Sequence, residues 1–238
     1  MALIVQKYGG TSVGSVERIQ HVANKVAGFR ADGHDVVVVV SAMSGETNRL
    51  IGLAHAISET PTPREMDVLV STGEQVTIAL LAMALNEIGV SARSYTGGQV
   101  RIHTDSAFMK ARIEAIDDAA IRADLAAGSV VIVAGFQGMD GAGNITTLGR
   151  GGSDTTAVAL AAALKANECQ IYPMSMGSTP RILGSYQRPG VCRKSPLRKC
   201  WKWHRLAPRC CKFGRWSLRV STTSHCECYR VLKMALAP

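Results

Sequence analysis

A basic residue lies close to glycines at two places in this sequence. The first is Lys7, which shortly precedes Gly9-Gly10-Thr11-Ser12. Glycines let the main chain approach a phosphate closely, and their N–H groups can form a concave anion-binding site. The alternative interpretation is an ordinary turn beside a solvated lysine. The sequence contains no G-x-x-x-x-G-K-[ST] pattern, so it does not encode a P-loop.

The second place is residues 149–156, which read Gly-Arg-Gly-Gly-Ser-Asp-Thr-Thr. Ser153 and Asp154 lie where an alanine-rich helix is predicted to begin, and helix N-termini favour anions. Arg150 can bind a carboxylate or a phosphate through two parallel hydrogen bonds. The alternative is a glycine linker in which Ser153 or Asp154 caps the helix, and both interpretations can hold together. We favour binding, because an arginine among glycines has little packing purpose.

Three further polar residues could contact a substrate. Glu74, in Ser71-Thr72-Gly73-Glu74, could receive a substrate ammonium, although the bare sequence favours a solvated glutamate on a helix surface. Ser41 and Thr47 follow a run of valines, where their hydroxyls could contact phosphate or substrate or could cap the next helix. No metal-ligand spacing links the histidines of this region, so we predict no metal site and expect them to be solvated: His21, His34, His55 and His103.

The elements that must position these residues alternate between strands and helices. Strands are predicted at Leu3–Val5, Val36–Val40, Arg93–Tyr95, Val130–Ala134 and Gln170–Tyr172. Helices are predicted from Ser15 to Gly28 or Gly33, over 44–58, over Arg64–Glu87 with an interruption around residues 71–73, and over Asp154–Lys165. Such alternation favours a mostly parallel sheet with helices on both faces.

The carboxyl ends of the predicted strands should gather the candidate residues along one edge of the sheet. Residues 7–10, 41–45 and 135–138 each follow a predicted strand directly. Ligands of open α/β sheets bind at the carboxyl ends of the strands. The five consecutive valines at 36–40 are apolar on both faces, which indicates a central strand covered on both sides.

The composition changes abruptly near residue 172. Of the 27 Lys and Arg residues, 13 precede residue 173, as do 17 of the 18 Asp and Glu residues, so residues 1–172 carry −4 and residues 173–238 carry +13. All three tryptophans and six of the seven cysteines lie in the second segment. We therefore treat 1–172 as one domain and 173–238 as a basic Cys- and Trp-rich tail.

Composition also indicates a compartment for residues 1–172. Their single cysteine, Cys169, suits a reducing cytoplasm. No apolar run approaches the ~18–20 residues that span a bilayer, and no secretion signal is expected, because no basic region precedes the apolar start. We expect a cytoplasmic protein that does not contact a membrane.

Five segments in this order resemble the aspartate kinases of the amino acid kinase family, from Leu3 to about Tyr172. They are Lys7-Tyr8-Gly9-Gly10-Thr11-Ser12, Val38-Val39-Val40-Ser41-Ala42-Met43, Ser71-Thr72-Gly73-Glu74, Val133-Ala134-Gly135-Phe136-Gln137-Gly138 and residues 146–156. The Gly-Phe-Gln-Gly and Gly-Arg-Gly-Gly-Ser-Asp segments distinguish aspartate kinases from relatives that act on glutamate, acetylglutamate or UMP.

The resemblance implies a three-layer α/β/α sandwich that transfers the γ-phosphoryl of MgATP to the β-carboxylate of L-aspartate, towards lysine, threonine and methionine. It implies that Asp154 orients a catalytic Lys7, and that the nucleotide lies near Lys7, Tyr8, Gly9, Gly10 and Ser41. Aspartate would be held by Thr47, Glu74, Arg150, Gly151, Gly152 and Ser153, with Arg150 on the α-carboxylate. Intact family members are oligomers with regulatory ACT domains, so the resemblance implies a truncated catalytic domain here.

The resemblance stops after Tyr172, where the family continues with T-D-V-D-G. Pro173-Met174-Ser175-Met176-Gly177 is encoded by CCN-ATG-TCN-ATG-GGN, and one A placed in front gives codons that permit T-D-V-D-G. Residues 199–204, shifted in the same way, force L, E and A within the family's E-M-L-E-M-A. We therefore predict one missing nucleotide near codon 173, a tail without stable structure, and a poorly soluble, nearly inactive chain.

Alternative functions remain open on the sequence alone. The front segment could belong to a related kinase for acetylglutamate or glutamate. The basic tail with its tryptophans could bind nucleic acid, and its cysteines could bind zinc, although they form no paired C-x₂-C pattern. We expect neither of these tail functions, because out-of-frame translation produces such residues by accident.

Overall fold

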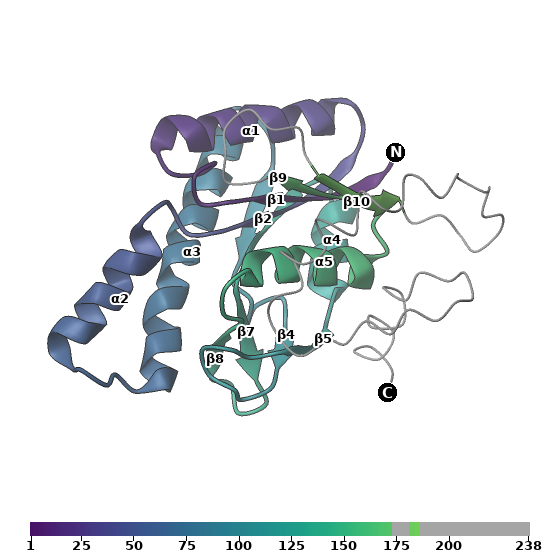
Figure 1. Cartoon of the computed structure of the whole chain (residues 1–238). Helices are drawn as coiled ribbons and strands as arrows, with labels where there is room; N and C mark the ends of the chain where they lie inside the picture. The colour runs from purple at the N-terminus through teal and green to yellow at the C-terminus, as the bar shows by residue number, and fades with distance from the viewer. Residues whose placement is uncertain (173–180, 186–238) are drawn as a thin grey trace, which may run out of the picture. The chain divides into compact units, whose positions relative to one another are not determined.

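Residues 1–172 and 181–185 are described in a computed structural model of the chain (Figure 1). The strands are β1 (Leu3–Tyr8), β2 (Asp35–Val40), β3 (Ala92–Tyr95), β4 (Ile102–Thr104), β5 (Ile113–Ile116), β6 (Val130–Ala134), β7 (Gln137–Asp140), β8 (Ile145–Thr147), β9 (Glu168–Tyr172) and β10 (Arg181–Ser185). The helices are α1 (Val16–Ala31), α2 (Glu46–Ile57), α3 (Pro63–Glu87), α4 (Ala119–Ala126) and α5 (Gly152–Leu164).

The larger sheet has the strand order β10-β9-β1-β2-β6-β3, and every neighbouring pair in it is parallel except β10 with β9. Residues Val36–Val40 of β2 are completely buried. This confirms the prediction that the valine run forms a central strand, because only a strand covered on both faces can bury successive apolar side chains.

Helices cover both faces of the larger sheet. On one face α1 and α3 pack through residues such as Val26 and Leu81 against the even-numbered valines of β2. On the other face α4 and α5 pack through residues such as Ile121 and Leu160 against Val37 and Val39. Figure 1 shows α1 and α5 on opposite sides of strands β9, β1 and β2. The predicted three-layer α/β/α arrangement with a mostly parallel sheet is confirmed.

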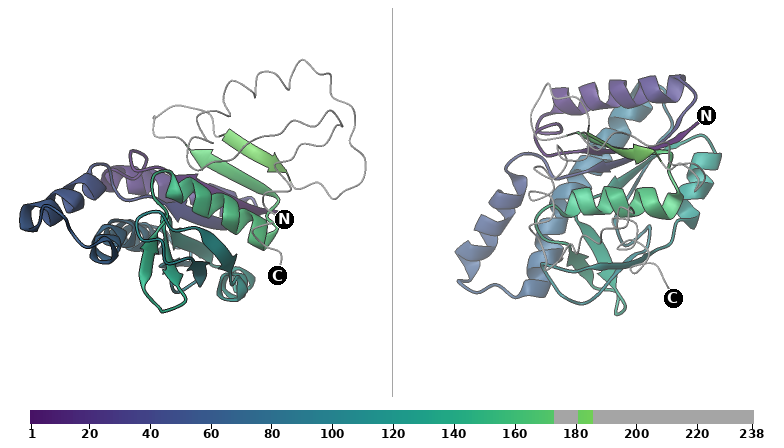
Figure 2. Two further views of the ribbon diagram at one scale, coloured as in Figure 1. Left: turned by 60° about the horizontal axis from the view of Figure 1, so that its bottom comes forward. Right: turned by 45° about the vertical axis from the view of Figure 1, so that its right-hand side comes forward.

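A second, smaller sheet was not predicted from the sequence. It has the order β5-β4-β7-β8 and lies beside α5, as the turned views in Figure 2 show. Gln137 and Gly138 were expected in a loop after a strand, but they begin β7. Gly138 is needed there because a Cβ atom would lie 2.6 Å from Thr104 Cγ2 and 2.7 Å from the Ile102 carbonyl oxygen of β4.

Helix α3 runs without the interruption that we expected at residues 71–73. The hydroxyls of Ser71 and Thr72 donate to the carbonyls of Val68 and Leu69 within the same helix, at 2.8 and 2.6 Å. These polar residues therefore do not break it. By length and composition α3 could span a membrane, but half of that apolar stretch is buried inside the fold, as is usual for a core helix.

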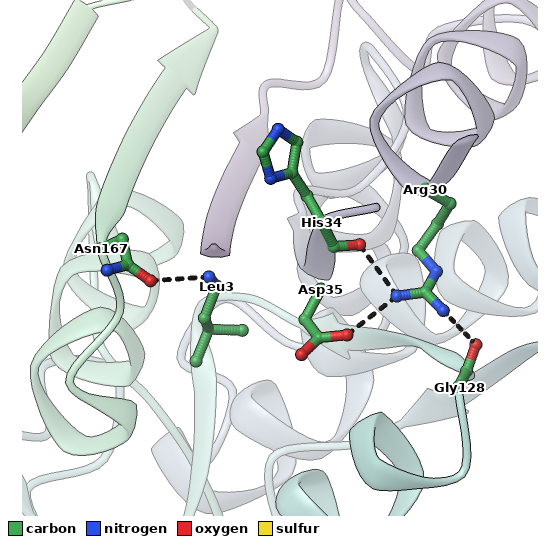
Figure 3. Close-up of polar contacts among 6 residues, drawn as sticks. All are labelled: Leu3, Arg30, His34, Asp35, Gly128 and Asn167. Carbon is green, nitrogen blue, oxygen red and sulfur yellow. Dashed lines mark hydrogen bonds and ion pairs between the residues drawn. The ribbon is translucent and has the colours of Figure 1, made fainter. Parts of the chain in front are cut away.

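Polar contacts join neighbouring elements at the amino-terminal ends of the strands in the larger sheet (Figure 3). Arg30 of α1 donates to the carbonyl of His34, to Asp35 Oδ1 and to the carbonyl of Gly128, each at 2.8 Å. The backbone N–H of Leu3 donates to Asn167 Oδ1 at 2.7 Å. These contacts join the starts of β1 and β2 to elements that are distant in sequence, and they lie at the opposite edge from the strand ends that carry the candidate site.

Within the tail, for which we expected no stable structure, Arg181–Ser185 forms β10 beside β9. Residues 173–180 and 186–238 lie outside the described residues. The predictions about the tail's cysteines, tryptophans and basic residues fall largely on those residues.

Candidate active site

An ion pair between a buried lysine and a half-exposed aspartate lies at the carboxyl end of β1. The Lys7 ammonium is 2.7 Å from Asp154 Oδ1 in the first turn of α5, and the Lys7 side chain is 9% exposed. The approach of α5 requires glycine at the end of β6, because a Cβ atom on Gly135 would lie 2.7 Å from Ser153 Oγ. The structure thus brings together two of the residues that we predicted, Lys7 and Asp154, and places Ser153 beside them, largely buried.

The loops after β1 and β2 are in direct contact. A Cβ atom on Gly10 would lie 2.7 Å from the carbonyl oxygen of Ala42, so this position accommodates only glycine without movement. The Ser41 N–H donates to the Tyr8 carbonyl at 3.1 Å, and the Gly135 N–H donates to the Val40 carbonyl at 3.0 Å. The carboxyl ends of β1, β2 and β6 therefore meet along one edge, as the strand order requires.

Glu74 projects from α3 into the same region and is 3% exposed. Its Oε1 accepts a hydrogen bond from the Ala42 N–H at 3.1 Å, whereas its buried Oε2 has no hydrogen-bond partner within the described residues. Burial raises the pKa of Glu74 to about 7, and the hydrogen bond from Ala42 opposes that shift. The interpretation of Glu74 as a solvated surface residue is wrong.

Arg150 is exposed on the loop between β8 and α5. Gly149 and Gly151 flank it with φ values of +75° and +80°, in the left-handed region that favours glycine. Because Arg150 precedes Asp154 by only four residues, it lies at the same edge as the Lys7–Asp154 pair. Thr47 lies half-buried in the first turn of α2. The roles of Arg150 and Thr47 in holding a substrate stay predictions.

The side chain of Tyr8 does not belong to this site. It lies on the opposite face of the sheet from Lys7, is 2% exposed, and stacks on Tyr172 with ring centroids 4.6 Å apart. Its hydroxyl donates to Gln6 Oε1 at 3.2 Å, and burial raises the pKa of Tyr8. The role of Tyr8 in binding a nucleotide stays a prediction, and its main chain is the part that could make that contact.

The histidines are partly as expected. His21 and His55 are exposed, as expected, whereas His34 and His103 are half-buried and so less solvated than expected. His103 lies in β4 of the unpredicted sheet, and His34 lies in the turn before β2. The strand that contains His103 was not predicted, whereas His34 lies between a helix and a strand that were.

Sequence reasoning missed Asp67, which is completely buried on α3. Its carboxylate accepts hydrogen bonds from the N–H groups of Met109 and Thr147 and from the Thr147 hydroxyl. Asp67, Ser71 and Glu74 recur at a spacing of four and three residues, which places them on one helix face. That spacing of polar residues, set against the apolar faces of the helix, is the signal that could have revealed Asp67.

The fold and the site define a class of protein: a three-layer α/β/α protein with glycine loops and a paired lysine at the carboxyl edge of its sheet. Residues 2–173 match the amino acid kinase family, and the chain belongs to that family.

Relatives at high identity within the family are aspartate kinases. The chain is 72% identical over 191 residues to the aspartokinase of Pseudomonas aeruginosa, covering 79% of this chain and 46% of the relative. It is 57% identical to aspartokinase 2 of Bacillus subtilis, covering 79% of this chain and 47% of the relative. The chain thus spans about half the length of the curated relatives that it matches.

Solved structures of aspartate kinases also superpose on this chain. The aspartate kinase from Synechocystis superposes with a TM-score of 0.63 at 53% identity, covering 72% of this chain and 28% of that one. Aspartokinase III of E. coli, in complex with aspartate and ADP, superposes with a TM-score of 0.60 at 30% identity, covering 71% of this chain and 48% of that one.

Proposed function

We propose that residues 1–172 form the catalytic core of an aspartate kinase, which transfers the γ-phosphoryl of ATP to the β-carboxylate of L-aspartate. The observation that carries the proposal is the convergence at one sheet edge of the Lys7–Asp154 ion pair and a buried Glu74 with an unpartnered oxygen. One is a cation suited to phosphate, and the other is an acceptor suited to an ammonium. The reaction would be the first step towards lysine, threonine and methionine, in the cytoplasm.

The nucleotide side of the site consists of Lys7, the N–H groups of Gly9 and Gly10, the main chain of Tyr8, and Ser41. Lys7 would neutralise charge on the transferring phosphoryl, and Asp154 would hold its ammonium in position. Mg²⁺ binds through nucleotide phosphates, waters and one or two carboxylates. Within the described residues no three His, Cys, Asp or Glu side chains form a metal-binding group, so the nucleotide's phosphates would supply most of the Mg²⁺ ligands.

The substrate side is built around charge complementarity. The free Oε2 of Glu74 would accept a hydrogen bond from the substrate ammonium, which would also remove the cost of an unsatisfied buried oxygen. Arg150 would bind the α-carboxylate, and the hydroxyls of Thr47 and Ser153 and the N–H groups of Gly151 and Gly152 would complete the pocket. The E. coli relative named above was solved with aspartate and ADP bound.

The chemical step needs no protein nucleophile. A β-carboxylate oxygen of aspartate forms a bond to the γ-phosphorus, while the bond from that phosphorus to the β–γ bridging oxygen breaks, giving aspartyl phosphate and ADP. The protein contributes alignment of the two reactants and stabilisation of the charge on the equatorial oxygens.

A kinase for N-acetylglutamate is the less favoured function. Its substrate carries an uncharged amide with a single N–H in place of the ammonium, so it would give the buried Oε2 of Glu74 no positive charge to pair with. Glutamate has the ammonium but is one methylene longer than aspartate. Nucleic-acid binding through the basic tail would depend on residues outside the described part of the chain.

We further infer that the gene lacks one nucleotide near codon 173. The match to the family model ends at residue 173, next to the change in composition, whereas the alignment to the Pseudomonas aeruginosa relative covers 79% of the chain. In the shifted frame the chain loses the rest of the nucleotide site, so we expect it to bind aspartate but to turn over poorly. Resequencing the coding DNA tests the frame, and an intact frame shared with close relatives would refute this inference.

Activity is tested by trapping aspartyl phosphate with hydroxylamine in the presence of MgATP. The chain as it stands should form hydroxamate slowly, and the product of a gene with one A added before codon 173 should form it rapidly. Aspartate should be the substrate, with little turnover of N-acetylglutamate or glutamate. Turnover of either of those acids in preference to aspartate would overturn the proposed function.

A further inference from the structure

The carboxylate of Asp67 is a buried, hydrogen-bonded group that the proposed mechanism does not use, and its hydrogen bonds link α3 to the segment that leads to Arg150. It is fully buried on α3, and within the described residues no Lys or Arg forms an ion pair with it. Burying a charge without a counter-ion is costly unless hydrogen bonds replace its hydration. The hydrogen bonds of Asp67 should therefore hold Met109 and Thr147, its partners, in fixed positions.

Those contacts converge on the strand that leads to Arg150. Oδ2 accepts from the Thr147 N–H at 2.9 Å, and Oδ1 accepts from the Thr147 hydroxyl at 2.6 Å. Both oxygens also accept from the Met109 N–H, at 3.0 and 2.9 Å. Thr147 is the last residue of β8, only three residues before Arg150.

The segment between Thr147 and Arg150 has little room to move independently. The Ala111 N–H donates to the Thr147 carbonyl at 2.8 Å, and the Leu148 N–H donates to the Phe136 carbonyl at 2.9 Å. A Cβ atom on Gly149 would lie 3.1 Å from the Met109 carbonyl oxygen. Asp67 therefore binds both Met109, whose carbonyl lies against Gly149, and Thr147, which precedes Gly149 by two residues.

The same helix carries Glu74, seven residues further along the same face. At 1.5 Å per residue the two positions are about 10 Å apart along the helix axis. Between them, the Ser71 carbonyl accepts a hydrogen bond from Gln137 Nε2 of β7 at 2.9 Å. Helix α3 thus contacts the β2–α2 loop through Glu74, β7 through Ser71 and β8 through Asp67.

We propose that Asp67 is a positioning residue that holds Arg150 at a fixed distance from Glu74. Helix α3 would then set the geometry with which the two charges of an α-amino acid are recognised, the ammonium by Glu74 and the α-carboxylate by Arg150. The inference rests on the proposed function for its ligand, but the hydrogen bonds of Asp67 and their effect on residues 147–152 do not depend on it.

The first test uses two ligands that differ by one group. L-Aspartate carries the α-carboxylate, whereas β-alanine is the same molecule without it. Ligand-observed NMR titration of the 238-residue chain gives Kd for each. Asp67→Asn should weaken aspartate binding about tenfold, equal to about 1.4 kcal/mol, and should change β-alanine binding less than twofold. Arg150→Ala should show the same selectivity, and the double variant should lose little more than either single variant.

A second pair of variants separates positioning from general loss of packing. Thr147→Val removes only the hydroxyl that donates a hydrogen bond to Asp67. Thr146→Val removes a hydroxyl in an equally buried residue that is hydrogen-bonded to the Thr104 hydroxyl instead. Thr147→Val should weaken aspartate binding severalfold, and Thr146→Val should leave it within twofold of the unmodified chain. Equal loss in both variants, or equal loss of aspartate and β-alanine in Asp67→Asn, would overturn the proposal.

Amide hydrogen exchange on the ligand-free chain tests the same idea without any ligand. Asp67→Asn should raise exchange at residues 147–152 at least tenfold and leave β1 unchanged. The control Arg30→Ala removes a comparable set of hydrogen bonds at the opposite sheet edge and should leave 147–152 protected. If the unmodified chain binds neither ligand, the proposed function fails. The positioning role fails only if exchange at 147–152 does not rise in Asp67→Asn, or rises equally in Arg30→Ala.

Discussion

Glu74 shows how one buried carboxylate can be prepared for a charged ligand. One oxygen is held by the Ala42 N–H, and the other has no hydrogen-bond partner within the described residues. In the free protein burial penalises the charged form and raises the pKa of Glu74 to about 7, so the carboxyl is partly protonated near neutral pH. An ammonium that arrives at Oε2 would favour the charged form, so ligand binding and ionisation of Glu74 should be coupled.

The raised pKa of Glu74 predicts a specific dependence of stability on pH. Its folded pKa of about 7 exceeds the model-compound value of 4.5, so between these values the folded state binds more protons than the unfolded state. Stability therefore falls as pH rises through this window, by about 3 kcal/mol in all. Glu74→Gln should abolish that component in urea denaturation measured from pH 4.5 to 7.5.

A matched control for this prediction lies on the same helix. Glu87 is exposed at the end of α3, so Glu87→Gln should leave the pH dependence of the unmodified chain intact. A Glu74→Gln variant with the same slope as the unmodified chain would show that Glu74 titrates normally.

Lys7 and Lys25 lie on opposite faces of the sheet, and we expect their substitution to affect different properties, kcat for Lys7 and stability for Lys25. Lys7 pairs with Asp154, whereas the Lys25 ammonium lies 3.8 Å from the centroid of the Tyr172 ring. In the protein made from the gene with one A added before codon 173, Lys7→Met should lower kcat for aspartate by about 10²–10³-fold. This is the range for loss of one preorganised charge-stabilising group. Lys25→Met should change stability by about 1 kcal/mol and leave kcat unchanged. Equal kcat in the two variants would exclude a role for Lys7 in the chemical step.

At the residue scale, the predictions made from glycine-rich patterns were more informative than those made from single polar residues. The glycines around Lys7 and before Asp154 indicated a shared edge, and the structure brings the two side chains into contact. The side chain of Tyr8 lies on the opposite face of the sheet from Lys7, because side chains alternate along a strand, and the glycine pattern alone does not show this. Asp67 was missed because its partners come from β8 and from Met109, and long-range pairing cannot be seen in local sequence.

At the scale of elements, long apolar patterns were predicted well and short strands were not. All five predicted strands occur in the larger sheet, and each predicted helix occurs with small changes at its ends. The four strands of the second sheet have only three or four residues each, which is too short to show alternation. Their pairing depends on close contacts such as that of Gly138 with β4, which only the folded chain reveals.

The C-terminus of α5 carries strain that a single substitution should relieve. Lys165 follows the helix in the left-handed conformation, with φ 54° and ψ 44°, and its side chain is exposed. A residue with a Cβ atom pays about 1 kcal/mol there, and glycine does not. Lys165→Gly should therefore raise the free energy of unfolding by about 0.5–1 kcal/mol in urea denaturation.

Lys165→Ala is the control, because alanine keeps the Cβ atom but removes the same charge and side-chain length. It should not reproduce the gain. If both variants stabilise the chain equally, the gain comes from loss of the lysine side chain and not from the backbone conformation.

For the whole molecule, the strands at the edges of the larger sheet are where another chain could pair with it. The sheet ends at β3 on one side and at β10 on the other. β10 comes from the segment after residue 172, where the composition changes, yet it pairs antiparallel with β9 through residues such as Arg181 with Ile171 and Ile182 with Gln170. A paired β9 is shielded from other chains, whereas an unpaired β9 would offer free N–H and carbonyl groups for association.

Removing the pairing of β10 should therefore convert the chain into a self-associating species. Ile182→Pro deletes a backbone N–H and fixes φ, which a paired strand tolerates poorly, whereas Ile182→Val keeps both the N–H and a high strand propensity. Sedimentation velocity over a tenfold range of concentration should show association of the proline variant and not of the valine variant. Amide exchange should rise at residues 168–172 only in the proline variant. If the proline variant stays monomeric with residues 168–172 protected, β10 does not shield this edge.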